Sequence, residues 1–144
     1  MDDLLLQIKG IIDKDLPLVS NLSNVSSILN QLDKINWCGF YLAQNGTLYL
    51  GPFQGDVACT KIPFGKGVCG SSAKEKKTII VDNVNDFPGH IACSSLSKSE
   101  IVVPIIKNDA VVGVIDIDSP IYSRFTDKEK SLLESVAIIL SELF

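Results

Sequence analysis

The chain has 144 residues, of which 46% are apolar, and it carries a formal net charge of −4. A chain of this length buries a substantial core as one domain without cross-links. The acidic balance argues against a nucleic acid or an anionic membrane as partner, because both bind clustered Lys and Arg. We therefore expect a single domain over residues 1–144. A small anionic pocket that binds amines remains compatible with this charge.

No targeting or membrane segment is expected. Acidic residues follow Met1 where a secretory signal has basic ones, and no apolar run reaches the roughly 18 residues that span a bilayer. We therefore expect a cytoplasmic protein whose four cysteines are kept reduced. There, a set of cysteines is more often catalytic or metal-binding than a static disulfide framework.

Two amphipathic helices are expected in the first part of the chain. Apolar side chains recur every three or four positions over residues 2–12 and 18–35, and Pro17 separates the two runs. The second helix is expected to be a packing element or a dimer surface. Residues 1–35 thus form a helical segment, and residues 36–144 hold the sheet, the active-site loops and a last helix.

The middle of the chain is expected to hold short strands separated by turns. β-branched and aromatic residues predict the strands, whereas glycine, proline and asparagine predict the turns. In chain order we expect a strand at 37–42, a turn at Asn45-Gly46, a strand at 47–50, a loop at 51–55, a strand with Cys59 at 57–62, a glycine-rich turn at 65–70 leading into a short helix with Cys69, and a strand at 78–81.

The glycine-rich turn is not expected to bind phosphate. It lacks both the glycine spacing and the terminal Lys-Ser/Thr pair of a nucleotide-binding loop. Its glycines are more simply explained by close backbone packing beside a thiol.

The C-terminal part completes an α+β fold. Residues 101–107 and 110–119 are apolar strands joined by an Asn108-Asp109 turn, and Thr126 begins an N-capped helix with an apolar stripe. Helices at both ends of a run of hairpin-linked strands predict a central, mostly antiparallel sheet with helices from both chain ends packed on it.

Residues 88–104 are the candidate functional centre. Cys93 lies four residues past Gly89 in a polar stretch that enters an apolar strand after Glu100. Buried structural thiols usually lie inside apolar runs, whereas reactive ones have polar, partly exposed surroundings. Cys93 is therefore the candidate nucleophile, with an inert cysteine as the alternative, and Glu100 is a candidate charge that orients the substrate.

Two further carboxylates, Asp116 and Asp118, are expected on one face of their strand, because strand side chains alternate. Like charges on one face favour a cationic partner such as a ligand ammonium. Glu100 joins this cluster if its strand pairs with theirs. The alternative is that one aspartate caps the following loop while the other points to water.

For Trp37, Tyr41 and His90 both a functional and a structural role are considered, and for Cys38 a structural role alone. Trp37 and Tyr41 form either a pocket wall for a sulfur group or part of the core. His90 is either an acid or base near Cys93 or is turned away from it. Cys38, inside the aromatic strand, is expected to be a packing residue.

The spacing of Cys59, Cys69 and Cys93 includes no Cys-x-x-Cys pair, which argues against structural zinc. We expect neither a metal nor a cofactor. Separated thiols suit a redox relay, in which one attacks an oxidised substrate, another resolves the sulfenic acid and an external dithiol reduces the disulfide.

Seven motifs together resemble the free methionine-(R)-sulfoxide reductase family, which are single-domain GAF proteins. They extend from Asn36 to the C-terminal part and are numerous, long and ordered. They are Asn36-Trp37-Cys38-Gly39-Phe40-Tyr41, Gly51-Pro52-Phe53-Gln54-Gly55, Ala58-Cys59, Gly65-Lys66-Gly67-Val68-Cys69-Gly70, Phe87-Pro88-Gly89-His90-Ile91-Ala92-Cys93, Ser99-Glu100-Ile101-Val102-Val103-Pro104 and Gly113-Val114-Ile115-Asp116-Ile117-Asp118-Ser119.

The resemblance implies a GAF-like fold and a reaction at sulfur. It makes Cys93 the thiolate that attacks the sulfoxide and is left as a sulfenic acid. It makes Cys69 the resolving thiol and Cys59 a second resolving or relay thiol. The chain departs from the family at Ser94, where an acidic residue is common, which concerns details of that loop.

The resemblance also implies the binding partners. Glu100, Asp116 and Asp118 recognise the substrate amino group and assist protonation of the sulfoxide oxygen, while Trp37 and Tyr41 surround its methyl-sulfur end. A thioredoxin-type reductant, a homodimer and an antioxidant role are implied as well. The alternatives are a GAF-type sensor without turnover, for which an output domain is expected, and a dimeric binding protein with structural cysteines.

Overall fold

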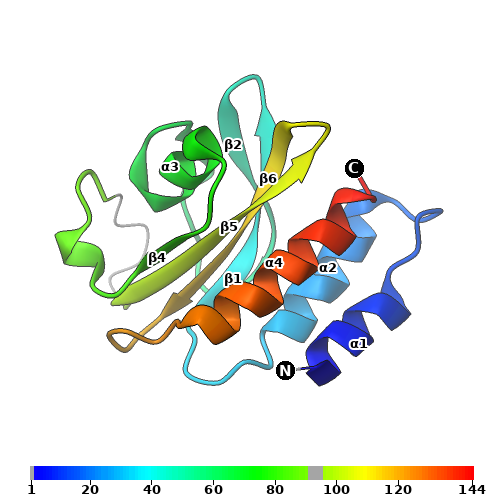
Figure 1. The fold of residues 1–144 in the computed structure, drawn as a ribbon, viewed down its shortest axis with the longest axis horizontal. Coiled ribbons are helices and arrows are strands. Elements are labelled where there is room, and N and C mark those ends of the chain that lie inside the picture. The colour runs from blue at the N-terminus through cyan, green and yellow to red at the C-terminus, as the bar shows by residue number, and fades with distance from the viewer. Residues whose placement is uncertain (1, 91–95) are drawn as a thin grey trace.

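The computed structural model describes residues 2–90 and 96–144, in which one antiparallel sheet is covered by helices (Figure 1). Within these ranges the six strands follow the order β3-β2-β1-β6-β5-β4. The elements are α1 (Asp2–Ile11), α2 (Leu18–Leu29), β1 (Trp37–Gln44), β2 (Thr47–Gln54), β3 (Lys61–Pro63), α3 (Gly67–Glu75), β4 (Ile79–Val81), the 3-10 turn η1 (Val84–Asp86), β5 (Ser99–Lys107), β6 (Ala110–Ser119) and α4 (Asp127–Ser141).

Helices from both chain ends cover one face of the sheet, as predicted. Figure 1 shows α2 and α4 side by side against this face, with α1 outermost. Apolar side chains of all three helices meet those of β1, β5 and β6, including Phe40, Ile101 and Ile115, in the larger of two cores. Cys38 is fully buried in this core, so its predicted packing role is confirmed.

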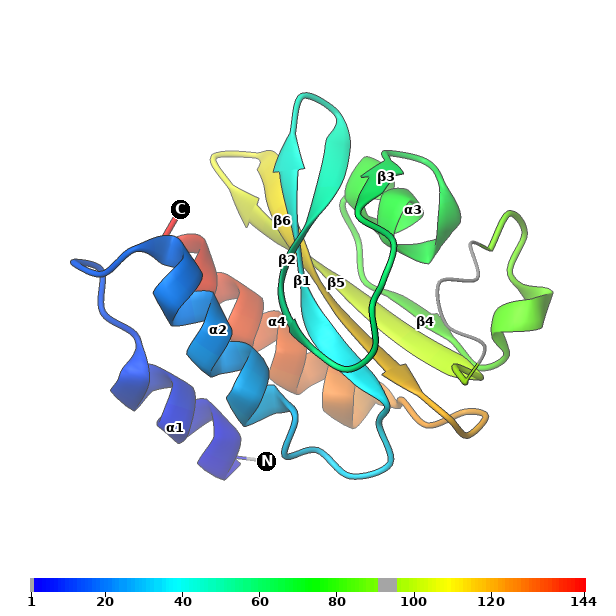
Figure 2. The ribbon, with the colours of Figure 1, turned by 180° about the vertical axis from the view of Figure 1, so that it is seen from behind.

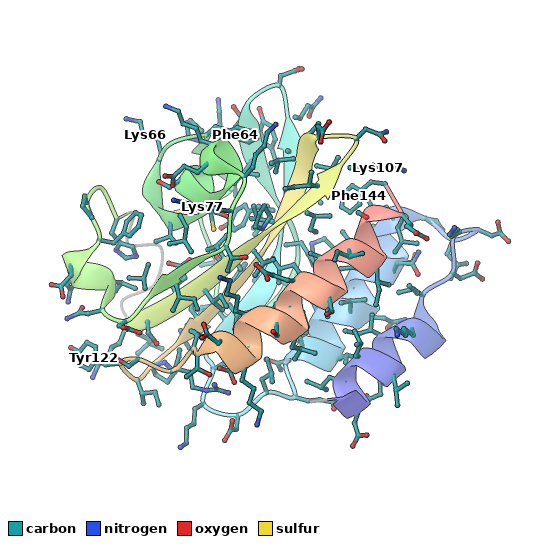
Figure 3. The ribbon with its side chains drawn as sticks, viewed as in Figure 1. Phe64, Lys66, Lys77, Lys107, Tyr122 and Phe144 are labelled. Atoms are coloured by element: carbon teal, nitrogen blue, oxygen red, sulfur yellow. The ribbon has the colours of Figure 1, made fainter. Side chains whose placement is uncertain are left out.

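The last helix is fixed at both of its ends. Thr126 and Glu129 form the reciprocal hydrogen bonds of a capping box at its start, as the sequence led us to expect for Thr126. After its end, the Lys107 ammonium donates a hydrogen bond to the Phe144 carbonyl, and the two residues lie together in Figure 3. The end of β5 is thereby tied to the chain end.

The opposite face of the sheet holds the second core and is covered by other segments of the chain. Helix α3 and the link between β2 and β3 lie over it, and Figure 2 shows this link crossing in front of the sheet. Because neighbouring strands are antiparallel and their side chains alternate, every second residue of β1, β5 and β6 points to this side.

Three boundary predictions were wrong, and the first two concern α2 and β2. Helix α2 ends at Leu29 rather than residue 35, and the chain turns through Lys34, which has a positive φ of 56° and whose carbonyl accepts a hydrogen bond from Ser119 Oγ. β2 continues through the expected loop at 51–55 as far as Gln54. Proline is tolerated there because Pro52 lies at a register shift, beyond the residues that pair with β3.

The strand expected at 57–62 is limited to Lys61–Pro63. Two carbonyls before it bind aromatic side chains, whereas the Thr60 carbonyl accepts a hydrogen bond from the Leu50 N–H of β2. Trp37 Nε1 donates to the Asp56 carbonyl at 3.0 Å, and the Tyr41 hydroxyl donates to the Cys59 carbonyl at 2.8 Å. These side-chain contacts account for backbone groups that a β-ladder would otherwise use.

No helix in the described ranges is both long enough and apolar enough to span a bilayer.

Gly39 marks the tightest approach between β1 and β2 and generates a stability prediction. A Cβ at this position would lie 2.3 Å from Phe53 Cβ and 2.8 Å from Phe53 Cα. We expect Gly39→Ala to lower the free energy of unfolding by about 1–3 kcal/mol through overpacking. Gly10→Ala is the matched control, since nothing lies within 4 Å of its added Cβ in α1, and it should be neutral or stabilising by up to about 1 kcal/mol. Equal urea midpoints for wild type and Gly39→Ala would contradict the clash.

Candidate functional site

Strand register gathers the three predicted carboxyls at the centre of the sheet. Glu100 on β5 lies opposite Asp118 on β6, and on its other side Asp118 lies opposite Trp37 of β1. Asp116 lies two residues before Asp118 on the same face of β6, opposite Gly39 of β1. The predicted shared face of the two aspartates and the pairing that adds Glu100 are therefore confirmed.

These side chains line a pocket on the face opposite α2 and α4. Its empty space is about 560 Å³ when the open solvent at its mouth is included. Strand side chains form its floor, while α3 and the link between β2 and β3 contribute walls. Seven of the residues singled out from the sequence line it, namely Trp37, Tyr41, Cys69, His90, Glu100, Asp116 and Asp118.

The carboxyls form no ion pair with any of the residues that the structure describes. Glu100 and Asp116 are 7% and 5% exposed, and none of the ion pairs of the described residues involves the cluster. The Oδ1 atoms of Asp116 and Asp118 are buried without a hydrogen-bond partner in the described part of the chain. Buried polar atoms of this kind are uncommon and are matched by a ligand or water in many sites.

Burial controls the protonation of the cluster. It raises the pKa of Glu100 and of Asp118 well above their ordinary values, and the charge of Asp116 raises both further. Burial also raises the pKa of Asp116, but hydrogen bonds from Glu100, Cys69 and Asp118 oppose that rise. The cluster therefore favours an ionised Asp116 beside protonated neighbours.

Cys69 extends the cluster from above the sheet. It lies in the first turn of α3, and its Sγ is 4.0 Å from Glu100 Oε2. Burial, followed by the charges of Asp116 and Glu100, raises the pKa of its thiol well above the ordinary value. The next residue, Gly70, has room for no side chain because a Cβ would lie 2.5 Å from the Pro63 carbonyl oxygen. The expected close backbone packing beside a thiol is confirmed.

An aromatic wall stands beside the carboxyls. Trp37 stacks on Tyr41 with ring centroids 6.0 Å apart and on Phe53 at 5.2 Å. Trp37 and Tyr41 are 3% and 2% exposed, so they belong to the second core and line the pocket as well. Their place in the core is thus confirmed, while their contact with a sulfur group stays a prediction.

Several residues at or beside the pocket were not assigned a site role from the sequence. Phe53 was placed in a loop, although its position opposite Gly39 makes it the far end of the aromatic stack. Lys66 and Ser97 also line the pocket. The available signals were weak: Lys66 stands between two glycines, and Ser97 precedes the strand that carries Glu100.

The four cysteines differ in their surroundings. Cys38 and Cys69 are buried free thiols on opposite faces of the sheet. Cys59 is disulfide-bonded and lies on the link whose carbonyl receives the Tyr41 hydroxyl. Cys93, the candidate nucleophile, lies outside the described residues. His90 lines the pocket, and burial lowers the pKa of its imidazole despite the charge of Asp116.

Comparisons with known proteins agree with this geometry. The sequence profile of the GAF domain matches residues 18–142. Free methionine-R-sulfoxide reductase of Saccharomyces cerevisiae is 50% identical over 99% of this chain and 84% of its own length. The protein of the same name from Escherichia coli is 43% identical over 87% of this chain and 76% of its own length.

A solved structure gives the same result in three dimensions. Free methionine-R-sulfoxide reductase from Neisseria meningitidis, in complex with its substrate, superposes with a TM-score of 0.93 at 41% identity. The match covers 98% of this chain and 86% of that chain. The sheet and the helices from both chain ends are therefore those of a GAF domain.

The raised carboxyl pKa values predict how stability depends on pH. Burial raises the pKa of Glu100 in the folded protein, so the folded state binds this proton more tightly than the unfolded chain does. The resulting contribution to stability is complete below the unfolded pKa and is lost as pH rises through the folded pKa. Glu100→Gln should therefore raise the Tm at pH 8, by roughly 3–4 °C for each kcal/mol recovered, and change it little near pH 4.

Glu129→Gln is the control of opposite sign. Burial raises the pKa of Glu129, but hydrogen bonds from Thr126 and the Arg124 charge lower it overall. That substitution should lower the Tm at pH 8, with the loss shrinking toward acid pH. Thermal scans between pH 4 and pH 8 measure both effects, and a Glu100→Gln Tm below that of wild type at pH 8 would contradict the pKa assignment.

Proposed function

The chain belongs to the free methionine-(R)-sulfoxide reductase family of GAF-domain proteins, and from this premise we propose that it reduces free methionine-(R)-sulfoxide to methionine. The observation that carries the proposal is the buried carboxyl cluster without an ion-pair partner in the described part of the chain. A free amino acid has an ammonium group that peptide-bound methionine lacks. An anionic pocket therefore favours the free form.

The three carboxyls divide the work between binding and proton transfer. Asp116 retains the most favourable conditions for a negative charge and binds the substrate ammonium. Glu100 and Asp118 have pKa values raised well above the ordinary range and are held protonated, so they donate hydrogen bonds and a proton to the sulfoxide oxygen. Trp37 and Tyr41 provide the apolar wall for the methyl-sulfur end.

The chemistry proceeds by transfer of the sulfoxide oxygen to a cysteine. The Cys93 thiolate attacks the sulfoxide sulfur and the sulfoxide oxygen takes one proton from a carboxyl. The S–O bond of the substrate breaks, methionine leaves, and the oxygen remains on Cys93 as a sulfenic acid, while solvent returns a proton to the carboxylate. A second thiol then attacks this sulfenic acid, which forms a disulfide and releases water. A thioredoxin-type dithiol reduces the disulfide and is itself oxidised.

The surroundings of Cys69 and Cys59 change the assignment of the thiol that resolves the sulfenic acid. The resemblance assigned this role to Cys69, with Cys59 as the second thiol. The raised pKa of Cys69 disfavours its thiolate, which is the attacking form, whereas Cys59 is found disulfide-bonded. We therefore assign the first disulfide to Cys59 and keep Cys69 as a pocket residue whose thiol donates toward the carboxyls.

The wider role follows from the same chemistry. An enzyme that returns oxidised free methionine to the reduced pool has an antioxidant role, and its dependence on a thioredoxin-type reductant suits a cytoplasmic location. Assembly as a homodimer belongs to this proposal as well.

Turnover of defined sulfoxides tests the reaction and the nucleophile. The wild type should convert the R epimer of free methionine sulfoxide with a dithiol reductant and leave the S epimer and the N-acetylated R compound largely unchanged. Cys93→Ser should lose at least about a thousandfold of this activity, because a hydroxyl at neutral pH cannot replace a thiolate nucleophile. Chiral chromatography of the remaining sulfoxide measures each rate.

Cys38→Ser is the matched control, since its thiol lies in the core on the other face of the sheet, and it should retain wild-type turnover. Wild-type rates in Cys93→Ser would end the assignment of the nucleophile. Saturable binding of the sulfoxide without any conversion by wild type would favour the GAF-type sensor.

Single-turnover experiments separate the two candidate resolving thiols. Cys59→Ser should release about one methionine per site and then stop. The sulfenic acid on Cys93 then has no resolving thiol, so the disulfide that thioredoxin reduces does not form. Cys69→Ser should continue to cycle, with its turnover altered by the changed carboxyl environment. The reverse pattern would return the resolving role to Cys69. Mass spectrometry of the two variants after one turnover identifies the species that accumulates.

A further inference from the structure

We propose that Cys69, Glu100 and Asp116 form a binding site for Zn²⁺ in the pocket, and that the bound ion excludes the substrate. The ion is a competing ligand of the pocket in which Cys69 is a free thiol, distinct from the structural zinc that the spacing of the cysteines argues against. Its exclusion of substrate rests on the function proposed above, whereas its binding does not.

The geometry of the three side chains fits a metal ion. One sulfur and two carboxylate oxygens lie within 4.8 Å of one another, and all three residues are buried. Ligand atoms of a tetrahedral Zn²⁺ site are about 3–4 Å apart, given Zn–S and Zn–O distances near 2.3 and 2.0–2.2 Å. The observed 4.0 Å from Cys69 Sγ to Glu100 Oε2 is close to this range, so small side-chain rotations suffice.

A separate observation points to a missing ligand. Asp116 is 5% exposed and lines the pocket, yet its Oδ1 has no hydrogen-bond partner among the described residues. A cation placed between the three side chains satisfies this atom and supplies the positive charge that the cluster lacks. Three protein ligands leave a fourth position open toward the pocket, as in zinc sites that exchange a water or a small molecule.

The donor set selects the kind of metal. Metal binding displaces the protons of the Cys69 thiol and the Glu100 carboxyl to solvent, which leaves one thiolate with two carboxylates as ligands. This donor set suits Zn²⁺ or the related Cd²⁺, whereas Ca²⁺ takes six to eight oxygen ligands and Mg²⁺ keeps several waters. A metal bound to Glu100 and Asp116 occupies the carboxyl that donates a proton to the sulfoxide and the carboxyl that binds the substrate ammonium. Zinc and the sulfoxide therefore compete for one pocket.

Spectroscopy without substrate tests the site directly. The protein is used with its Cys59 disulfide intact, so that this thiol cannot ligate metal, and is titrated with Cd²⁺ while the thiolate-to-metal absorption in the ultraviolet is followed. We expect one equivalent of Cd²⁺ to produce the band, and Zn²⁺ added afterwards to displace it. Ca²⁺ and Mg²⁺ at the same concentrations should produce no effect.

Variants locate the ligands. Cys69→Ser should abolish the band and weaken Zn²⁺ binding, measured by calorimetry, by at least about tenfold, and Asp116→Asn should weaken binding similarly. Cys38→Ser should leave both signals unchanged, since this free thiol lies on the opposite face of the sheet. Thermal scans confirm that each variant is folded before its titration is interpreted.

Three outcomes would overturn the site. They are the absence of calorimetric Zn²⁺ binding below 1 mM in wild type, an undiminished Cd²⁺ band in Cys69→Ser, and a band lost in Cys38→Ser. Inhibition of sulfoxide reduction by Zn²⁺, relieved by added substrate, tests exclusion separately. Zinc binding without inhibition would overturn exclusion alone, and inactivity of the protein toward the sulfoxide would leave the spectroscopic result intact.

Discussion

Three carboxyl groups lie side by side in an apolar pocket, and holding them there is the constraint on which the rest of this structure depends. Burial of such groups is unfavourable unless they are protonated, hydrogen-bonded or paired with a cation. The central pairing of β5, β6 and β1 places Glu100, Asp118 and Trp37 in one row, so the groups cannot separate without breaking the sheet. No ion pair of the described residues supplies the positive charge, which is the basis of the proposal that a ligand ammonium binds there.

The two faces of the sheet divide stability from chemistry. The face under α1, α2 and α4 has the larger apolar core, and its cysteine, Cys38, is an inert packing residue with its pKa raised to about 12, chiefly by burial. The other face has the smaller core and holds the polar groups together with Cys69. A protein can keep a costly site when stabilising contacts elsewhere offset it, which is a common relation between function and stability.

The aromatic stack links the pocket to the chain that crosses it. Trp37 and Tyr41 each use a buried polar atom to bind a carbonyl of the link between β2 and β3, and the second of these carbonyls belongs to Cys59. The same rings line the pocket. The backbone at Cys59 is thus positioned by side chains that also line the pocket, which couples the placement of this cysteine to the integrity of the pocket wall.

The sequence by itself determined the class of fold, the approximate positions of the helices and strands, and the shared face of Asp116 and Asp118, because these follow from local periodicity and turn chemistry. The resemblance of its motifs supplied the family. Only the tertiary structure decided that Glu100 lies opposite Asp118, that Phe53 completes the aromatic stack and that the carbonyls of Asp56 and Cys59 bind aromatic side chains. It also decided that Cys69 lies within the carboxyl cluster while Cys38 lies behind the sheet. These facts depend on strand register and on contacts between residues far apart in the chain, which no local pattern encodes.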